Sequence, residues 1–227
     1  MVSARGLRYT AILGSLDQRA RAGQNPAMTD IKNICVYCGS SAGVDPRLAE
    51  AAEELGRSMA NAGIGLVYGG GNNGLMGRTA RAVLDNGGHV TGIIPDFLQR
   101  RESMLHGAQE MITVEDMHTR KRLMFERSDA FVALPGGIGT LEELVEQMTW
   151  VQLERHTKPV LIADIGGFWQ PLLSLFSHMR EAGFVRPEME ISYLVAREVA
   201  DIVPMILAAQ RHHAEVGQEK RDVSPKL

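Results

Sequence analysis

The chain has 227 residues and a formal net charge of −3, with 44% apolar and 22% charged residues. A chain of this length suits one domain whose core needs no disulfide or metal to hold it together. The weak negative charge argues against a nucleic-acid-binding protein, which usually carries a basic domain, and leaves the binding of a small anion open. No apolar run approaches the roughly 20 residues of a membrane-spanning helix, so no membrane partner is expected.

The first segment, residues 1–30, does not look like a secretory signal, because its apolar part, YTAILG, is short and charged residues follow it. The segment is rich in Arg, and we expect a transit-like or disordered, flexible extension there. The folded domain is expected over residues 31–211, followed by a polar tail over residues 212–227.

The two cysteines, Cys35 and Cys38, stand in a C-x-x-C arrangement. This spacing suits a redox pair or half of a zinc site, but a zinc ribbon needs a second pair, which the chain lacks. Both residues fall in the apolar run NICVYC, which favours two buried thiols in a strand. Because nothing indicates an oxidising compartment, we expect a cytoplasmic protein without a bound metal.

From Ile31 onward, apolar runs typical of strands alternate with amphipathic runs typical of helices. Pro46 at the first turn and Gly63 at the end delimit the first helix. The stretch 98–110 predicts a loop with irregular helix. Strands are expected within 31–41, 64–71, 89–95, 111–117, 129–137 and 158–167, and helices within 45–63, 74–88, 118–128, 139–156 and 168–184, before a last short strand and helix over 193–215.

The strand segments GLVYGG, FVALPGG and VLIADIGG are nearly continuous apolar runs. Continuous runs are typical of strands buried on both faces, hence of a parallel sheet covered by helices. The regular alternation of strand and helix therefore predicts an α/β fold: a Rossmann-like, doubly wound parallel sheet with helices on both faces, in a single domain.

Glycine- or serine-rich turns follow four of these strands, at 38–41, 69–77, 135–140 and 165–167. In such a fold, ligands bind beyond the carboxyl ends of the strands. Glycine lets the backbone approach a ligand closely, and the helix that follows presents its amides and its positive dipole end. The sequence therefore predicts an anion site, and a ligand that carries a phosphate.

One of these turns, GGGNNG, fits the dinucleotide motif G-x-G-x-x-G through Gly69, Gly71 and Gly74. Asp96, at the end of the next strand, stands about where a ribose-binding acid belongs. The motif alone is weak support for a nicotinamide cofactor. Two features argue against a nicotinamide cofactor. The motif lies in the second strand–helix unit and not in the first, and the glycine turn at Pro135 has no role in binding such a cofactor.

The stretch GTLEEL allows two interpretations. Thr140 and Glu143 have the T-x-x-E spacing of a capping box, in which Thr140 caps the helix and Glu143 reaches back to the Thr140 amide. Glu142 is then a solvated acid near the positive end of the helix. In the second interpretation, the glycines cradle a phosphate and a carboxylate is held over a bond that is to be broken.

Arg120 and Lys121 stand near the start of an expected helix, where cations are disfavoured. They form either a solvated basic face or a site for an anion at the same edge of the sheet. His118 is interpreted as a structural neighbour of Arg120.

The motif MHTRK (117–121), followed by PGGIGTLEE (135–143) and preceded by YGGGNNGLMG (68–77), resembles the Lonely Guy family. These enzymes are cytokinin riboside 5′-monophosphate phosphoribohydrolases, many of which carry an old lysine decarboxylase label. The resemblance covers about residues 31–211. It implies hydrolysis of the N-glycosidic bond of adenosine 5′-monophosphate or an N6-modified form of it, giving the free base and ribose 5-phosphate. It also implies at least a homodimer, with sites close to the subunit interface, and no cofactor.

Carried over by motif, the resemblance makes Arg120 and Glu143 the catalytic pair. Glycoside hydrolysis passes through an oxocarbenium-like sugar, which a carboxylate can stabilise or supply with an activated water. Arg120 is a poor proton donor because a guanidinium group holds its proton tightly, so we expect it to orient the ribose phosphate and Glu143. The residues implied to bind substrate are Ser40, Gly70, Gly71, Glu102, Met117, Arg120, Lys121, Gly136, Gly137, Gly139, Thr140 and Glu142.

Ile138 departs from the family, in which an aromatic or polar residue often follows PGG, and this leaves the preferred base open. A non-hydrolytic nucleotide or cofactor carrier of the molybdenum-cofactor type remains the alternative. A carrier has no need of Arg120 together with Glu143, so the pair favours the enzyme. Lysine decarboxylation is disfavoured, because no lysine stands in a convincing setting for pyridoxal phosphate.

Overall fold

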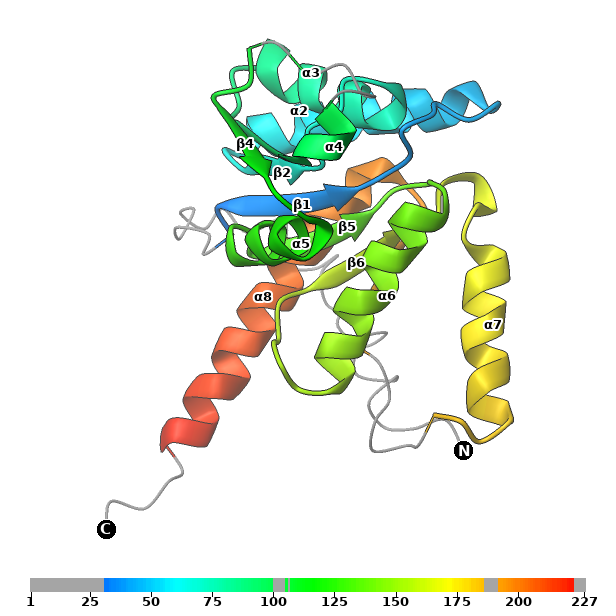
Figure 1. Ribbon diagram of the computed structural model, residues 1–227. Helices are drawn as coiled ribbons and strands as arrows, with labels where there is room; N and C mark the ends of the chain where they lie inside the picture. Colours follow the sequence, from blue (N-terminus) through cyan, green and yellow to red (C-terminus); the bar gives the residue numbers. More distant parts are fainter. Residues whose placement is uncertain (1–30, 100–104, 106, 186–191, 223–227) are drawn as a thin grey trace.

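The computed structural model describes residues 31–99, 105, 107–185 and 192–222. The elements alternate along the chain, as the sequence predicts (Figure 1). The strands of this part of the chain are β1 (Asn33–Tyr37), β2 (Gly65–Tyr68), β3 (Val90–Pro95), β4 (Glu110–Val114), β5 (Ala130–Ala133), β6 (Val160–Ala163) and β7 (Leu194–Ala196). The helices are α2 (Pro46–Asn61), α3 (Gly74–Asp85), α4 (Asp96–Gln99), α5 (Met117–Glu126), α6 (Ile138–Gln152), a 3₁₀ turn η1 (Ile165–Gly167), α7 (Gln170–Glu181) and α8 (Val199–Asp222).

The strands form one sheet in the order β4-β3-β2-β1-β5-β6-β7, and every pair in it is parallel. The chain builds outward from β1 to β4 and then returns through α5 to place β5 on the other side of β1. Ile34 of β1 is thus in register with both Leu66 and Ala130. The strand order reverses between β1 and β5, which is where open parallel sheets bind their ligands.

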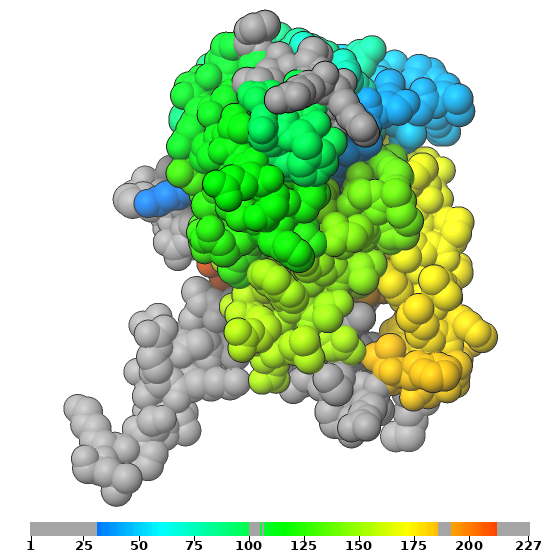
Figure 2. All heavy atoms as spheres, viewed as in Figure 1, coloured from blue at the N-terminus to red at the C-terminus, as the bar shows by residue number. Residues whose placement is uncertain are grey.

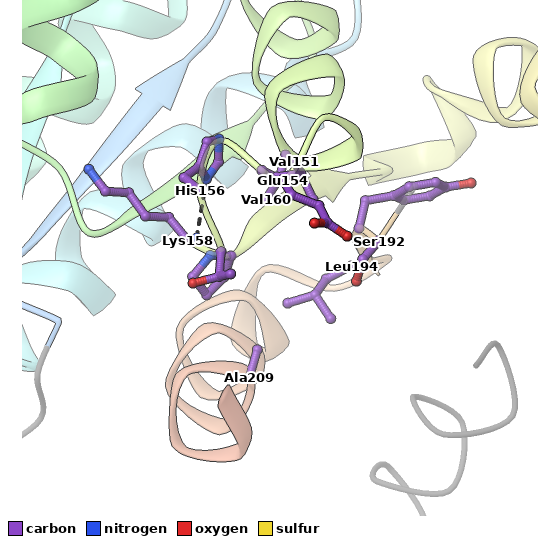
Figure 3. A pocket seen from close by; sticks show the side chains of 11 residues that line it. Val151, Glu154, His156, Lys158, Val160, Ser192, Leu194 and Ala209 are labelled. Carbon is purple, nitrogen blue, oxygen red and sulfur yellow. Dashed lines mark hydrogen bonds between the residues drawn. The ribbon is translucent and has the colours of Figure 1, made fainter. Parts of the chain in front are cut away.

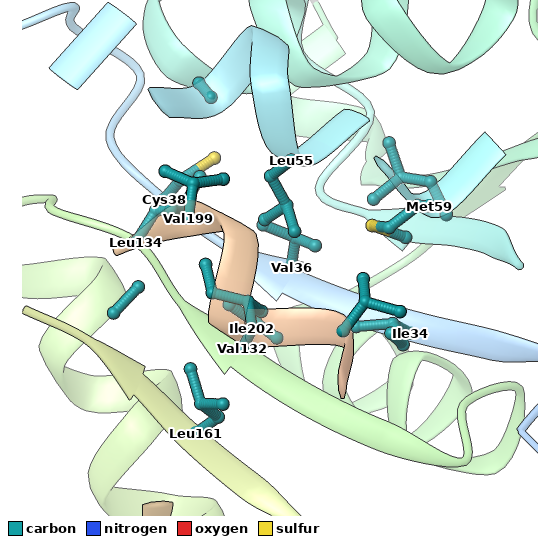
Figure 4. Packing of buried hydrophobic residues seen from close by; sticks show 14 of the residues in the cluster. Ile34, Val36, Cys38, Leu55, Met59, Val132, Leu134, Leu161, Val199 and Ile202 are labelled. Atoms are coloured by element: carbon teal, nitrogen blue, oxygen red, sulfur yellow. The ribbon is translucent and has the colours of Figure 1, made fainter. Parts of the chain in front are cut away.

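Helices cover both faces of the sheet, which confirms the predicted fold. On one face α2, α3 and α8 pack against alternate strand residues such as Ile34, Val36 and Val132 (Figure 4). On the other face α5, α6 and α7 pack against Cys35, Tyr37 and their neighbours. Successive residues of β1 point to opposite cores, so both sets must be apolar, and this explains the continuous apolar run in the sequence.

Two local features follow the predictions. The α2 helix begins after Asp45, whose side chain accepts a hydrogen bond of 3.0 Å from the Arg47 amide, and Pro46 occupies its first turn. Cys35 and Cys38 are both buried and free, so the core interpretation of the C-x-x-C pair is confirmed.

Two helix ends differ from the predictions. The helix expected over 139–156 ends at Gln152, because the chain turns at Glu154, which adopts a left-handed φ of 55°. The α8 helix continues to Asp222, past residue 212, where we expected a polar tail to begin. No helix among the described residues is both long enough and apolar enough to cross a membrane.

Candidate active site

Three loops meet where the strand order reverses. They follow β1, β2 and β5, which are neighbours in the sheet but far apart in the sequence. Gly39, after β1, joins them with its backbone: its amide donates to Pro135 O over 3.1 Å, and its carbonyl accepts from the Leu75 amide over 3.0 Å. The glycine-rich turns of the sequence are therefore tied together at one edge of the sheet.

Glycine is required in these loops by close packing. A Cβ at Gly136 would collide with the Thr140 side chain and would lie 2.9 Å from the Gly39 amide nitrogen. A Cβ at Gly69 would collide with the guanidinium of Arg120. Gly136 thus makes room for the neighbouring loop, and Gly69 makes room for the arginine. Close packing alone therefore explains why these two positions are glycine.

The α6 helix begins earlier than the capping-box interpretation requires, so that interpretation is wrong. Gly137 precedes the helix in an extended conformation, and no side chain caps the first turn. Thr140 is the third residue of the helix and is buried, so it does not cap, and Glu143 lies one turn further along. The amides of the first turn have no intrahelical acceptor at this uncapped start, as at any helix N-terminus, and they lie beside the glycine loop.

The α5 helix brings Arg120 to the same place. Asp116 caps this helix by accepting a 2.7 Å hydrogen bond from the Thr119 amide, which sets the position of the following turn. The Nη2 atom of Arg120 lies 3.7 Å from Oε1 of Glu143, and both side chains are only 11% exposed. The Nη1 atom contacts the sulfur of Met117 at 3.8 Å, and the buried Nε atom has no hydrogen-bond partner.

Arg120 and Lys121 do not form the solvated basic face that was one interpretation of the sequence. The Lys121 side chain is 14% exposed, and its Nζ atom lies 2.6 Å from Glu142 Oε1 and 2.9 Å from Glu146 Oε1. Burial opposes the charge of Lys121, but the hydrogen bonds to the two carboxylates outweigh it and raise the pKa of the ammonium. In Figure 1, α5 and α6 lie in front of the sheet, and this ion-pair cluster joins them.

Glu143 has an unusual electrostatic position. Burial raises the pKa of its carboxyl group to about 7, against the opposing effect of the Arg120 charge. Lys121 also lowers this pKa, whereas the carboxylates of Glu142 and Glu146 raise it. A carboxyl group with a pKa near neutrality can exchange a proton with a reactant at physiological pH, as acid–base catalysis requires.

The remaining residues expected to bind substrate lie in the loops after β1 and β2 and at the start of α6, apart from one acid. Gly70 and Gly71 are buried in the loop after β2, and Ser40 is exposed in the loop after β1. Gly137 and Gly139 are exposed at the start of α6, with open space where a Cβ would stand. The acid Glu102 lies outside the described residues.

Sequence reasoning missed Glu146. The signal was present, because Glu146 follows Glu142 by four residues and so lies on the same side of α6, one turn further on. What the sequence did not indicate was the partner, since Lys121 reaches this acid from another helix. Among the described residues, no group of three or more His, Cys, Asp or Glu side chains could hold a metal ion.

The model of a protein family described as possible lysine decarboxylase matches residues 76–206. An Arabidopsis thaliana protein named cytokinin riboside 5′-monophosphate phosphoribohydrolase LOG1 is 43% identical over 189 residues, which cover 83% of this chain and 89% of that protein. A Rhodococcoides fascians protein named cytokinin riboside 5′-monophosphate phosphoribohydrolase is 41% identical over 176 residues, covering 77% of this chain and 89% of that protein. The chain belongs to the Lonely Guy family.

The solved structures that resemble this chain show the fold. A Moco carrier protein from Chlamydomonas reinhardtii matches with a TM-score of 0.60 and 22% identity, covering 80% of this chain and 98% of that chain. At this identity the likeness concerns the fold alone. The carrier alternative therefore has less support than the Lonely Guy relationship, which extends over most of the sequence at about twice the identity.

A hollow of about 430 Å³ lies away from this site (Figure 3). Its lining includes the first residues of β6 and β7, Val160 and Leu194, so it opens at the amino edge of the sheet, opposite the glycine loops. Its lysine, Lys158, is already engaged, because Nζ donates to Phe125 O over 2.8 Å and lies 3.9 Å from the centre of the Phe125 ring. This hollow contributes nothing to the arrangement around Arg120 and Glu143.

Proposed function

We propose that this protein hydrolyses the N-glycosidic bond of a nucleoside 5′-monophosphate, with an N6-modified adenosine 5′-monophosphate of the cytokinin type as the expected substrate. The observation that carries the proposal is the buried pair of Arg120 and Glu143, 3.7 Å apart, beside glycine loops at the point where the strand order reverses. Relatives with over 40% identity are named for this activity, which supports the same assignment.

The substrate phosphate is proposed to bind at the start of α6. The open positions at Gly137 and Gly139 leave room for a ligand against the backbone, and the amides of the first turn are suitable donors to an anion. The buried Nε of Arg120 has no protein partner, and a substrate oxygen would satisfy it. Buried donors without a protein partner call for a bound group, which supports substrate binding beside the arginine.

The chemistry assigned to Glu143 follows from its pKa. Cleavage gives the sugar a developing positive charge at the anomeric carbon, which a nearby carboxylate stabilises. The same carboxylate accepts a proton from the attacking water, for which a pKa of about 7 is well matched to neutral pH. The guanidinium of Arg120 is assigned to hold the ribose phosphate against Glu143.

The test is release of free base from AMP and from N6-isopentenyl AMP, followed by chromatography, with Glu143→Gln and an exposed control, Glu126→Gln. We expect the parent and the control to release base, and Glu143→Gln to be slower by at least about 100-fold while it still binds nucleotide in calorimetry. Nucleotide binding by the parent without release of base from either compound would contradict the proposal and favour a carrier.

We also infer that the protein is a cytoplasmic homodimer. The α7 helix has no fully buried residue, and it exposes Leu175 (45%) and Met179 (38%) on one face. Figure 2 shows α7 along the margin of the molecule beside α6. A second copy covering this face would remove these side chains from water. Free, buried thiols at Cys35 and Cys38 are compatible with a reducing compartment.

A further inference from the structure

Lys121 links the two helices that carry the catalytic pair. It stands on α5 directly after Arg120, and its ammonium bridges two acids of α6, Glu142 at 2.6 Å and Glu146 at 2.9 Å. Glu142 directly precedes Glu143. The ion-pair cluster and the catalytic pair therefore join the same turns of the same two helices, one beside the other.

The two contacts differ in how tightly they hold the helices. Arg120 and Glu143 are 3.7 Å apart, longer than a hydrogen bond, so their attraction does not fix their geometry. The bonds of Lys121 are short and charge-assisted, and they are made where its side chain is 14% exposed and that of Glu146 is 24% exposed. Lys121 thus makes the short polar contacts between α5 and α6 beside the catalytic pair, where they add to apolar packing such as that of Phe125 against Trp150.

Resting on the function proposed above, we infer that Lys121 and Glu146 are positioning residues, which hold Arg120 at its working distance from Glu143. In this assignment Lys121 directs two of the three donors of its ammonium group to carboxylates of α6, and it serves to hold the helices and not to bind the substrate phosphate. Glu146 is not among the residues expected to contact substrate, and the inference assigns it the role of holding Lys121.

The charges around Glu143 give this inference a specific signature. Arg120 and Lys121 face it from α5, Glu142 and Glu146 from its own helix, and three residues of or beside β1 lie within electrostatic reach: Cys35, Tyr37 and Cys38. Burial raises the pKa of each of those three groups, so they stay neutral. The charge of Lys121 lowers the pKa of Glu143, whereas the charge of Glu146 raises it. Removing Lys121 should therefore raise this pKa, and removing the charge of Glu146 should lower it.

The experiment compares Lys121→Met, Glu146→Gln and the double variant with matched controls. Arg122→Met and Glu126→Gln remove the partners of an ion pair on the same helix α5, with side chains 59% and 48% exposed. Circular dichroism and thermal melting establish that each variant is folded. Rates of base release give kcat, KM and the pH profile.

We expect each single variant to lose about tenfold or more in kcat with KM within about threefold of the parent, since a small misplacement of reacting groups slows the chemical step. The double variant should be no slower than the slower single variant, because both changes break one cluster. The midpoint of the pH profile should rise in Lys121→Met and fall in Glu146→Gln. The controls should match the parent.

The inference is wrong if the folded Glu146→Gln variant keeps the kcat and the pH profile of the parent. An increase in KM confined to Lys121→Met would also overturn it, because Lys121 would then be a substrate contact. If the parent releases no base from either nucleotide, the proposed function fails for these substrates, and crystal structures of the two variants still decide the inference. A changed distance between Arg120 and Glu143 supports it, and a distance that stays at 3.7 Å in both variants overturns it.

Discussion

Glu143 shows how one side chain acquires its chemistry from its surroundings. In water its carboxyl group would be ionised at neutral pH, but burial on α6 raises its pKa to about 7. Arg120 reduces this effect without cancelling it, because the two groups are 3.7 Å apart and make no hydrogen bond. The residue is thus poised between its two protonation states, which suits a catalyst and destabilises the folded protein.

The rate of base release should increase with pH across neutrality. If the ionised carboxylate of Glu143 accepts a proton from water, kcat/KM rises from pH 6 to pH 8 with an apparent pKa near 7 in the free protein. A rate that falls over this range would instead indicate that the protonated form of Glu143 is required. Initial rates in buffers of constant ionic strength decide between the two.

Glu143→Gln should change stability in a pH-dependent way. The folded pKa of Glu143, about 7, is above the unfolded value of 4.5, so its stability contribution is fully present below pH 4.5 and is lost as the pH rises through 7. The neutral Gln escapes this loss. Relative to the parent, we expect the variant to gain roughly 1 to 3 kcal/mol in going from pH 4.5 to pH 8. Urea unfolding at both values measures this, and equal differences at both would contradict it.

At the scale of elements, the turn between β5 and α6 combines two demands. The backbone of Gly136 packs against Gly39 and Thr140, which closes the loops after β1 and β5 on one another. Three residues later Gly139, already inside the helix, faces open space. The first glycine is required by packing, whereas the second is tolerated by the helix and leaves room above the amides.

The two glycines should therefore respond oppositely to alanine. Gly136→Ala forces its Cβ against Thr140 and should destabilise the protein by about 1 to 3 kcal/mol. Gly139→Ala meets no neighbour and removes backbone freedom from the unfolded chain, so it should stabilise the protein by a few tenths to about 1 kcal/mol. Thermal melts of both variants test this, and a loss of stability in Gly139→Ala would show that its surroundings are not open.

At the scale of the whole molecule, the strand order brings the site together. Winding outward from β1 and then returning to place β5 beside it puts the loops after β1, β2 and β5 at one edge. The segment that connects β4 to β5 contains α5, which places Arg120 3.7 Å from Glu143 on the next helix, α6. Both groups proposed to be catalytic come from α5 and α6, which cover the same face of the sheet as α7, and α7 carries the exposed apolar residues.

The apolar face of α7 should control the oligomeric state. A variant with Leu175→Glu and Met179→Glu places two charges where a second copy would pack, and charges buried without partners are strongly unfavourable. Light scattering after gel filtration should give a dimer for the parent and a monomer for this variant. Ala200→Glu, an exposed change on α8, serves as the control and should remain dimeric. A monomeric parent would contradict the proposed homodimer.

The sequence by itself determined the class of fold and indicated most of the residues proposed for the site. Strands such as GLVY and AFVA are apolar at every position, which only a strand buried on both faces explains, and the glycine turns mark where such strands end. The motifs around Arg120 and Glu143 were sufficient to identify the family. These features are local: each depends on a few adjacent residues and on the period of the element that contains them.

Only the tertiary structure decided how those residues are used. The spacing of Thr140 and Glu143 suggested a cap, yet the chain enters the helix at Ile138, and Glu143 is buried against an arginine 23 positions earlier in the sequence. Lys121 likewise binds Glu142 and Glu146 from another helix. Such pairings depend on how two helices pack on a sheet, and the burial that raises the pKa of Glu143 arises only when that packing is complete.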